Sequence, residues 1–213
     1  MTSSTGAADG RVARGVRTRE AVVAAFEELI TERGKGPTAS ELAKRAGVSC
    51  RSIFSHFGDM DGVMSAAARR LFDHLSDAHV PISRQLPVDE RIEAFVVQRA
   101  RTLEITAPFY RAVMAQTSPS PALSQLLNEA MELARADTMF VFRAELSGVE
   151  DGLCEDLEEA MLVVTSWHHW EGLRGVQLLS LPQASAVMRL ELRGLLGRSA
   201  AQTATATAEA VES

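Results

Sequence analysis

The sequence predicts an all-α protein with a small N-terminal head of three helices and a larger helical body. Apolar residues recur at helical spacing along most of the chain, and no segment alternates convincingly at the two-residue period of a strand. Gly and Pro residues divide the chain into about nine segments of helical length. Both observations favour helices packed on helices, without a sheet.

Composition sets the broad class. The chain has 213 residues, of which 46% are hydrophobic and 23% charged, enough to bury a sizeable core. No apolar run approaches the ~18 residues of a membrane span, and the N-terminus lacks the layout of a secretory signal. The two cysteines have no metal-ligand spacing. We therefore expect a cytoplasmic, reduced protein without membrane contact, cofactor or metal.

The charge is unevenly distributed. Residues 11–58 hold nine Lys/Arg and five Asp/Glu, a net charge of +4, within a chain whose net charge is −6. The remaining residues therefore carry −10. A basic head on an acidic body is typical of a protein that presents one end to nucleic-acid phosphates.

The two ends differ from the rest of the chain. Residues 1–13 and 199–213 are small and polar and have no periodic apolar positions, so both are expected to be disordered tails. Between them, we expect a head over residues 14–60 and a body over residues 61–198.

The head should consist of three helices. The first, over about residues 17–33, has one apolar stripe and ends at a Gly-Lys-Gly-Pro sequence. Thr38 and Glu41 form a capping box that begins a short helix over about residues 39–45. Gly47 makes a tight turn, and Ser49 caps a third helix over about residues 50–56.

Further helices are predicted in the body, separated by Pro and Gly residues. They cover about residues 60–78, 88–105, 108–116, 120–146, 151–179 and 182–196.

Two short helices joined by a Gly-containing turn have the form of a helix-turn-helix. The second helix of such a motif enters the major groove and must be polar on its outer side. Here Val48, Ile53 and Phe57 are the expected anchors on the core. The outer side is expected to carry Cys50, Arg51, Ser52, Ser55 and His56.

The segment Ser-Glu-Leu-Ala-Lys-Arg-Ala-Gly-Val-Ser over 40–49, followed by Ser-Ile-Phe-Ser-His-Phe over 52–57, resembles the head motif of the tetracycline-repressor (TetR) family. The resemblance covers about residues 17–64. A weaker one lies over 166–174, similar to the "W-x-x-LR" stretch of many members. The resemblance to the TetR family implies a homodimeric, ligand-responsive repressor that binds a palindromic DNA operator. The implied DNA contacts are Thr38, Ser40, Cys50, Arg51, Ser52, Phe54, Ser55 and His56.

Three positions depart from the family pattern. Met60 stands where members usually have a phosphate-binding Lys, Phe54 replaces a frequent Tyr, and Arg51 stands where Gly or Pro is frequent. These changes suggest a rearranged set of phosphate and base contacts.

The resemblance also implies a dimer built from the last two long helices and an effector site in the body. The expected dimer residues are Met161, Val164, His168, Met188, Leu192 and Leu195. The candidate effector residues are Phe95, Arg99, Tyr110, Met114, Met131 and Trp167, although such residues are more often plain core.

Other readings are less favoured. A metal site at His168-His169 or around His74 and His79 is disfavoured, because the spacing does not bring enough ligands together. The chain lacks the sequence motifs of common enzymes. A helical interaction module without DNA activity stays open, supported by Met60 and the acidic total charge.

Overall fold

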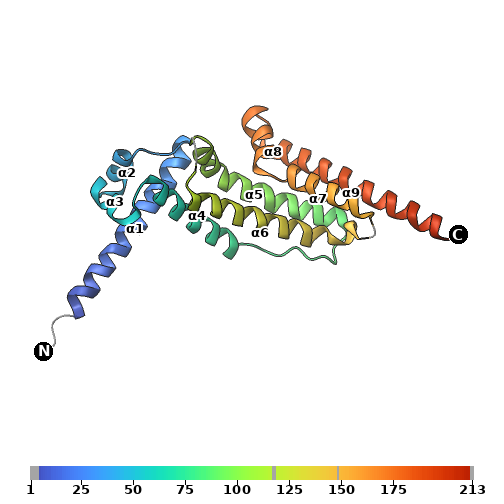
Figure 1. The fold of residues 1–213 in the computed structure, drawn as a ribbon. Coiled ribbons are helices and arrows are strands. Elements are labelled where there is room, and N and C mark those ends of the chain that lie inside the picture. Colours follow the sequence, from blue (N-terminus) through green and yellow to red (C-terminus); the bar gives the residue numbers. More distant parts are fainter. Residues whose placement is uncertain (1–4, 117–118, 148, 212–213) are drawn as a thin grey trace. The chain divides into compact units, whose positions relative to one another are not determined.

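The computed structural model describes residues 5–116, 119–147 and 149–211. These residues are helical or irregular and contain no strand, so the predicted all-α class is confirmed (Figure 1). In chain order, the helices are α1 (Thr5–Arg33), α2 (Ala39–Ala46), α3 (Cys50–Phe57), α4 (Met60–Asp77), α5 (Val88–Met114), α6 (Pro121–Leu146), α7 (Asp151–Val164), α8 (Trp167–Glu171), the π-helical turn η1 (Gly172–Val176) and α9 (Leu181–Val211).

The chain forms two compact units, one of residues 1–78 and 108–130 and one of residues 79–107 and 131–213. The first, unit 1, contains the predicted head together with α4, the end of α5 and the start of α6. The second, unit 2, contains the rest. The predicted boundary at residue 60 falls between α3 and α4, whereas α4 packs on both α1 and α3.

Unit 1 is held by one apolar cluster. The predicted stripe of α1 is buried, with Val22, Phe26 and Leu29 between 0% and 2% exposed. Leu42 of α2 and Ile53 of α3 are fully buried in the same cluster, so each short helix has one large side chain at the centre of its contact with the core.

Unit 2 combines an apolar core with a buried ion pair. Phe95 of α5 and Phe142 of α6 meet edge to face, with ring centroids 5.2 Å apart. Arg91, 4% exposed, donates to the carboxylate of Glu145 and to the carbonyl of Val141. A buried guanidinium needs several acceptors, and α6 supplies them.

Two predicted helix boundaries are wrong. The first is the break expected at Pro108, which lies inside the continuous helix α5. A proline removes one backbone hydrogen bond and strains the preceding turn. Its neighbours Ala107 and Phe109 are both buried, so packing on both sides holds the helix together.

The second is the single helix expected over 151–179, which is divided at Thr165 and Ser166. The hydroxyl of Thr165 donates back to the carbonyl of Met161, 2.8 Å away. The hydroxyl of Ser166 accepts from the backbone N–H of His169 and so begins α8. Sequence reasoning overlooked this serine cap.

Helix also extends into both segments that were expected to be disordered. α1 begins at Thr5, and α9 continues to Val211. Alanine has the highest helix propensity, and the chain after Gly197 contains many alanines and neither Gly nor Pro. This propensity explains helix without a periodic apolar face.

Candidate DNA-binding surface

Helix α2 begins at a complete capping box. The Thr38 hydroxyl accepts from the backbone N–H of Glu41, and the Glu41 carboxylate accepts from the backbone N–H of Thr38 at 2.8 Å. The backbone and hydroxyl hydrogen bonds from Thr38, with a further one from Arg33, lower the pKa of Glu41 to about 2. The ionised carboxylate therefore fixes where α2 starts.

The turn between α2 and α3 depends on a glycine. Gly47 has φ 68° and ψ 29°, in the left-handed region, and its N–H bonds the carbonyl of Ala43. A side chain at this backbone conformation is strained, so Gly47 sets the sharp change of direction. Ser49 then caps α3 by accepting from the N–H of Ser52 at 3.1 Å.

Helix α3 has one buried side and one exposed side. Ile53 is fully buried, and Val48 and Phe57 pack against the same core. On the opposite side Arg51, Phe54 and Ser55 are exposed. This division agrees with the arrangement expected of a helix that reads the major groove.

The other predicted contacts vary in exposure. Thr38 and Ser40 are exposed at the start of α2, whereas Ser52 and His56 are half-buried on α3. Cys50 is also half-buried, and its thiol donates to the carbonyl of Ala39 at 3.5 Å. The Cys50 thiol thus points toward α2, unlike the groove-facing orientation that the sequence suggested.

Arg19 fixes the far end of α3, and sequence reasoning missed this role. Its guanidinium donates to the backbone carbonyl of His56 at 2.6 Å and lies over the ring of Phe57, 4.5 Å from the centroid. The only sequence signal is its place three residues before Val22, the start of the buried stripe of α1.

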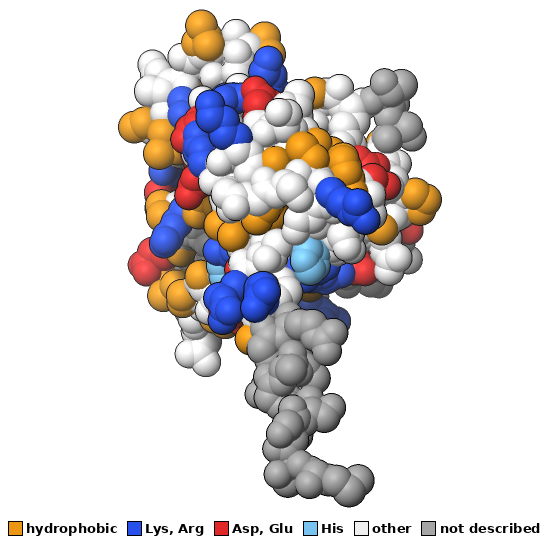
Figure 2. Space-filling model, turned by 90° about the vertical axis from the view of Figure 1, so that its left-hand side faces the viewer, with side chains coloured by type: hydrophobic (Ala, Val, Ile, Leu, Met, Phe, Trp, Pro, Cys, Tyr) orange, Lys and Arg blue, Asp and Glu red, His pale blue; other side chains and the backbone are white. Residues whose placement is uncertain are grey.

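Not all cations of the head are equally available. Arg45 is paired with Glu28 and Glu32, and Arg33 with Glu41. Arg51 is exposed and forms no ion pair among the described residues. Figure 2 views the molecule from the left-hand side of Figure 1, and Lys and Arg side chains are spread over this face.

Met60 belongs to the core of unit 1. It is half-buried and packs against the apolar cluster, while Asp59 caps α4 by accepting from the N–H of Gly62 at 2.8 Å. An apolar side chain at this position therefore contributes packing where a lysine would contribute charge.

The six candidate effector residues are divided between the units. Tyr110 and Met114 belong to unit 1 and the other four to unit 2. Phe95 is core, whereas Met114 and Met131 are 51% and 64% exposed. Arg99 donates to the carbonyl of Thr165, two residues before the nearly buried Trp167. This hydrogen bond connects Arg99 of α5 to the segment that leads into Trp167 of α8.

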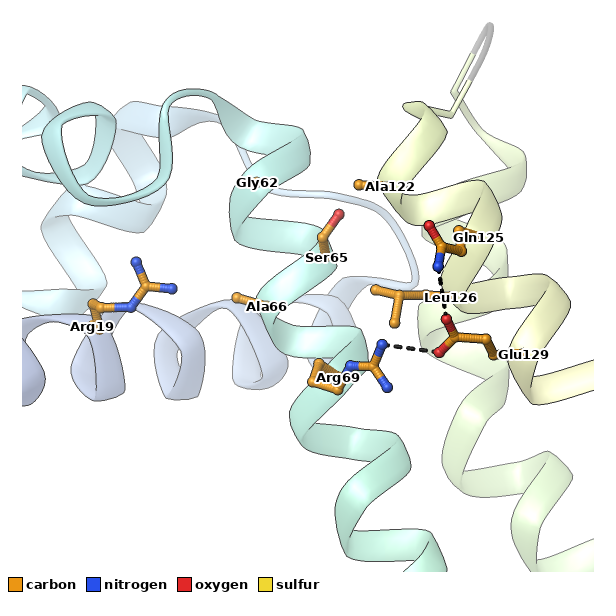
Figure 3. Close-up of a pocket in the computed structure, with 9 residues that line it drawn as sticks. All are labelled: Arg19, Gly62, Ser65, Ala66, Arg69, Ala122, Gln125, Leu126 and Glu129. Carbon is orange, nitrogen blue, oxygen red and sulfur yellow. Dashed lines mark hydrogen bonds and ion pairs between the residues drawn. The ribbon is translucent and has the colours of Figure 1, made fainter. Parts of the chain in front are cut away.

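A shallow cleft of about 390 Å³ lies in unit 1, and none of the six residues lines it. Its walls come from α1, α4 and the start of α6 (Figure 3). Arg69 and Glu129 form an ion pair across it at 2.9 Å. The hydroxyl of Ser65 is buried and has no hydrogen-bond partner among the described residues.

Three of the predicted dimer residues are core residues of unit 2. Met161, Met188 and Leu192 are fully buried within the single chain, so they cannot form the contact surface itself. Val164 and Leu195 are half-buried, and His168 is exposed. The helical spacing of apolar residues indicated an apolar side on α7 and α9. It could not indicate whether that side packs within the same chain or against a partner subunit.

Two further features are absent from the described residues. No group of three or more metal-ligating side chains occurs among them. None of their helices is long and apolar enough to cross a membrane.

Comparisons with known proteins agree with this geometry. The sequence model of the bacterial regulatory proteins, tetR family, matches residues 22–67, which cover the capped α2, the turn and α3. The HTH-type transcriptional regulator BetI of Escherichia coli (strain K12) is 25% identical over 139 residues, which are 62% of this chain and 71% of BetI. BetI of Klebsiella pneumoniae (strain 342) is 26% identical over 137 residues, 62% and 70% of the two chains.

The fold also has a counterpart among solved structures. A transcriptional regulator from Rhodococcus sp. Rha1 superposes with a TM-score of 0.64 at 21% identity, over 84% of this chain and 96% of that one. Together with the capped helix-turn-helix and its exposed face, these matches show that residues 22–67 form a head like that of the bacterial regulatory proteins of the tetR family, and that the chain is similar to HTH-type transcriptional regulators.

Proposed function

We propose that this regulator is a homodimeric repressor that binds a palindromic operator and is released from it by a small-molecule effector. The observation that carries the proposal is the exposed face of α3, with Arg51 and Ser55 outward and Ile53 fully buried behind them. An α-helix presented in this way fits the major groove.

Within this proposal, Arg51 is the main base-reading or phosphate-binding group of α3. Ser52, Phe54, Ser55 and His56 supply the neighbouring contacts along the helix. Ser40 contacts a phosphate from the start of α2, where the helix dipole favours an anion. Thr38 supports this contact by holding the start of α2 in place, because its N–H and its hydroxyl both donate to Glu41. Cys50 has the least support, because its thiol is engaged by Ala39.

The dimer is proposed to form through the outer sides of α7 and α9, which pack on one another in unit 2. Val163 of α7 is 60% exposed and Leu190 of α9 is 72% exposed. Of the predicted residues, Val164 follows Val163 directly in sequence, whereas His168 and Leu195 lie five residues after Val163 and Leu190, respectively. A twofold dimer would place two copies of α3 about 34–36 Å apart, on successive turns of the major groove.

The effector is proposed to bind in unit 2, near Arg99 and Trp167, where a cationic and an aromatic group come from different helices. Phe95, on the same helix as Arg99, is core and would support such a site from behind. Binding there would shift the protein toward a form with lower operator affinity, a coupling of about 1–3 kcal/mol. We place the protein in the cytoplasm, where its DNA is.

Selection of bound duplexes from a random library tests the proposal. We expect a palindromic site, and an affinity that falls steeply with salt concentration. Recovery of no enriched sequence, together with salt-independent behaviour, would favour the rival reading of a helical interaction module without DNA activity.

A further inference from the structure

Helix α1 extends well beyond the part that packs in the apolar core of unit 1. Among its described side chains, the first buried one is Val22, and residues 12–21 are exposed or half-buried throughout. From Thr5 to Val22 the helix extends ~25 Å at 1.5 Å per residue. The described side chains of this extension, residues 12–19, are here called the α1 arm. Apart from Arg19, packing within unit 1 does not explain the side chains of the α1 arm.

The α1 arm passes beside the end of the recognition helix α3. A Cβ atom at Gly15 would lie 3.6 Å from Cε1 of His56, so the backbone of α1 runs close to that side chain. Arg19 holds the same point through its hydrogen bond to the His56 carbonyl and its stacking on Phe57. The arm therefore leaves the head at the C-terminal end of α3, at a fixed place.

The charge of the α1 arm differs from that of the rest of the helix. Residues 12–19 contain Arg14, Arg17 and Arg19 and no acidic residue, whereas residues 20–33 contain four glutamates and one arginine. Arg14 and Arg17 are exposed and form no ion pair among the described residues. In Figure 2, basic side chains lie where the described chain meets the grey N-terminal residues, with a histidine close by.

We propose that the α1 arm is a second DNA-contacting element, in which Arg14 and Arg17 bind backbone phosphates of the duplex flanking the half-site read by α3. This inference rests on the proposed operator binding. The two arginines are three residues apart and so lie on neighbouring positions of the helix surface. Charge complementarity favours a polyanion as the partner, and the arm's position beside α3 favours the duplex that α3 reads.

A second copy of this chain is the rival occupant of the arm. Val12 and Val16 are 66% and 49% exposed and lie four residues apart on one side. Two valines form a small apolar patch, below the area that a stable protein interface needs. The exposed arginines therefore favour DNA over a second copy of the chain as the partner of the α1 arm. Self-association is one outcome that the test can detect.

The test measures binding to two operator duplexes, one ending at the limits of the half-sites and one extended by about one helical turn on each side. Wild-type protein is compared with Arg14→Ala/Arg17→Ala. On the extended duplex, we expect the double variant to bind at least ~10-fold more weakly, with a salt slope smaller by up to ~3.6, since the dimer loses four phosphate contacts of ~0.9 each. On the short duplex, the two proteins should bind alike.

Matched variants separate charge from position. Arg101→Ala/Arg143→Ala removes the same charge from exposed positions of unit 2 and should leave both slopes unchanged. Arg14→Lys/Arg17→Lys should keep most of the affinity, because a phosphate accepts a lysine as a point charge. Equal thermal melting curves confirm that the surface variants fold.

The outcomes distinguish this inference from the proposed function. If wild-type protein selects an operator and the Arg14/Arg17 variant binds the extended duplex with equal affinity and slope, the α1 arm does not touch DNA. If wild-type protein selects no sequence, operator binding itself fails, and the inference fails with it. A loss of affinity that follows a change in sedimentation, and that Val12→Ser/Val16→Ser reproduces, assigns the arm to self-association instead.

Discussion

Arg51 is the exposed cation at the first turn of the recognition helix, and it forms no ion pair among the described residues. Arg51→Ala should therefore reduce operator affinity at least ~10-fold, a loss of ~1.4 kcal/mol, through one lost phosphate or guanine contact in each half-site. Titration of a labelled operator measures the effect. Arg143→Ala in unit 2 is the control, and unchanged binding by folded Arg51→Ala protein would remove Arg51 from the interface.

Arg19 acts differently, because it orients α3 through the His56 carbonyl and the Phe57 ring. Arg19→Ala should lower the stability of the head by about 1 kcal/mol, from one charged hydrogen bond and one exposed cation–π contact. Arg19→Lys should restore only part of this, since an ammonium cannot reproduce the planar stacking. Chemical denaturation monitors both variants, and an unchanged unfolding midpoint for Arg19→Ala would contradict the role.

At the scale of elements, α2 depends on its capping box. Thr38→Ala removes the acceptor for the N–H of Glu41 and should destabilise the head by about 1 kcal/mol, whereas Thr38→Ser should be nearly neutral. Thermal unfolding of the two variants gives the comparison. If serine and alanine destabilise equally, the hydroxyl does not cap α2.

The same box makes the stability of the head depend on pH. The pKa of Glu41 is lowered from 4.5 to about 2 by hydrogen bonds from Thr38 and Arg33. Its contribution is fully present above pH 4.5 and is lost as the pH falls toward 2. Wild-type protein should therefore melt above Glu41→Gln at pH 7 and approach it near the lower end of this range. A constant difference in melting temperature would contradict the assignment.

Elements were predictable where the sequence marks their ends. The boundaries of α2 and α3 follow from Thr38, Gly47 and Ser49, whose roles are local and depend on few neighbours. Pro108 led to a wrong prediction of a helix break, because tertiary packing keeps α5 continuous across the proline. The break at Ser166 is marked by its hydroxyl, which accepts from the N–H of His169 and begins α8, and a periodic pattern does not reveal this cap.

At the scale of the whole molecule, the sequence pattern predicted which side chains are buried better than it predicted what they pack against. Met161, Met188 and Leu192 were identified as an apolar side, and they are buried, but within their own chain. The six effector candidates were chosen by type alone, and they do not form one group. Sequence patterns predict which side of a helix avoids water, whereas the partner depends on how distant helices meet.

The assembly can be tested through the exposed residues that remain on α7 and α9. Leu190→Glu and Val163→Glu place charge on the proposed interface without disturbing the core, since both side chains are largely exposed in the single chain. Light scattering should report about twice 23.0 kDa for wild-type protein and about 23.0 kDa for the variants.

These variants should also lose operator affinity, although their heads are unchanged. Two heads on one frame make the second contact nearly intramolecular, and a single head rarely reaches the ~10⁻⁸ M affinity of specific binders. Val97→Glu on α5 is the control, because Val97 is an exposed valine of unit 2 outside α7 and α9. Dimeric Leu190→Glu protein that binds the operator normally would place the interface elsewhere, and a wild-type monomer that protects a palindromic site would end the dimer proposal.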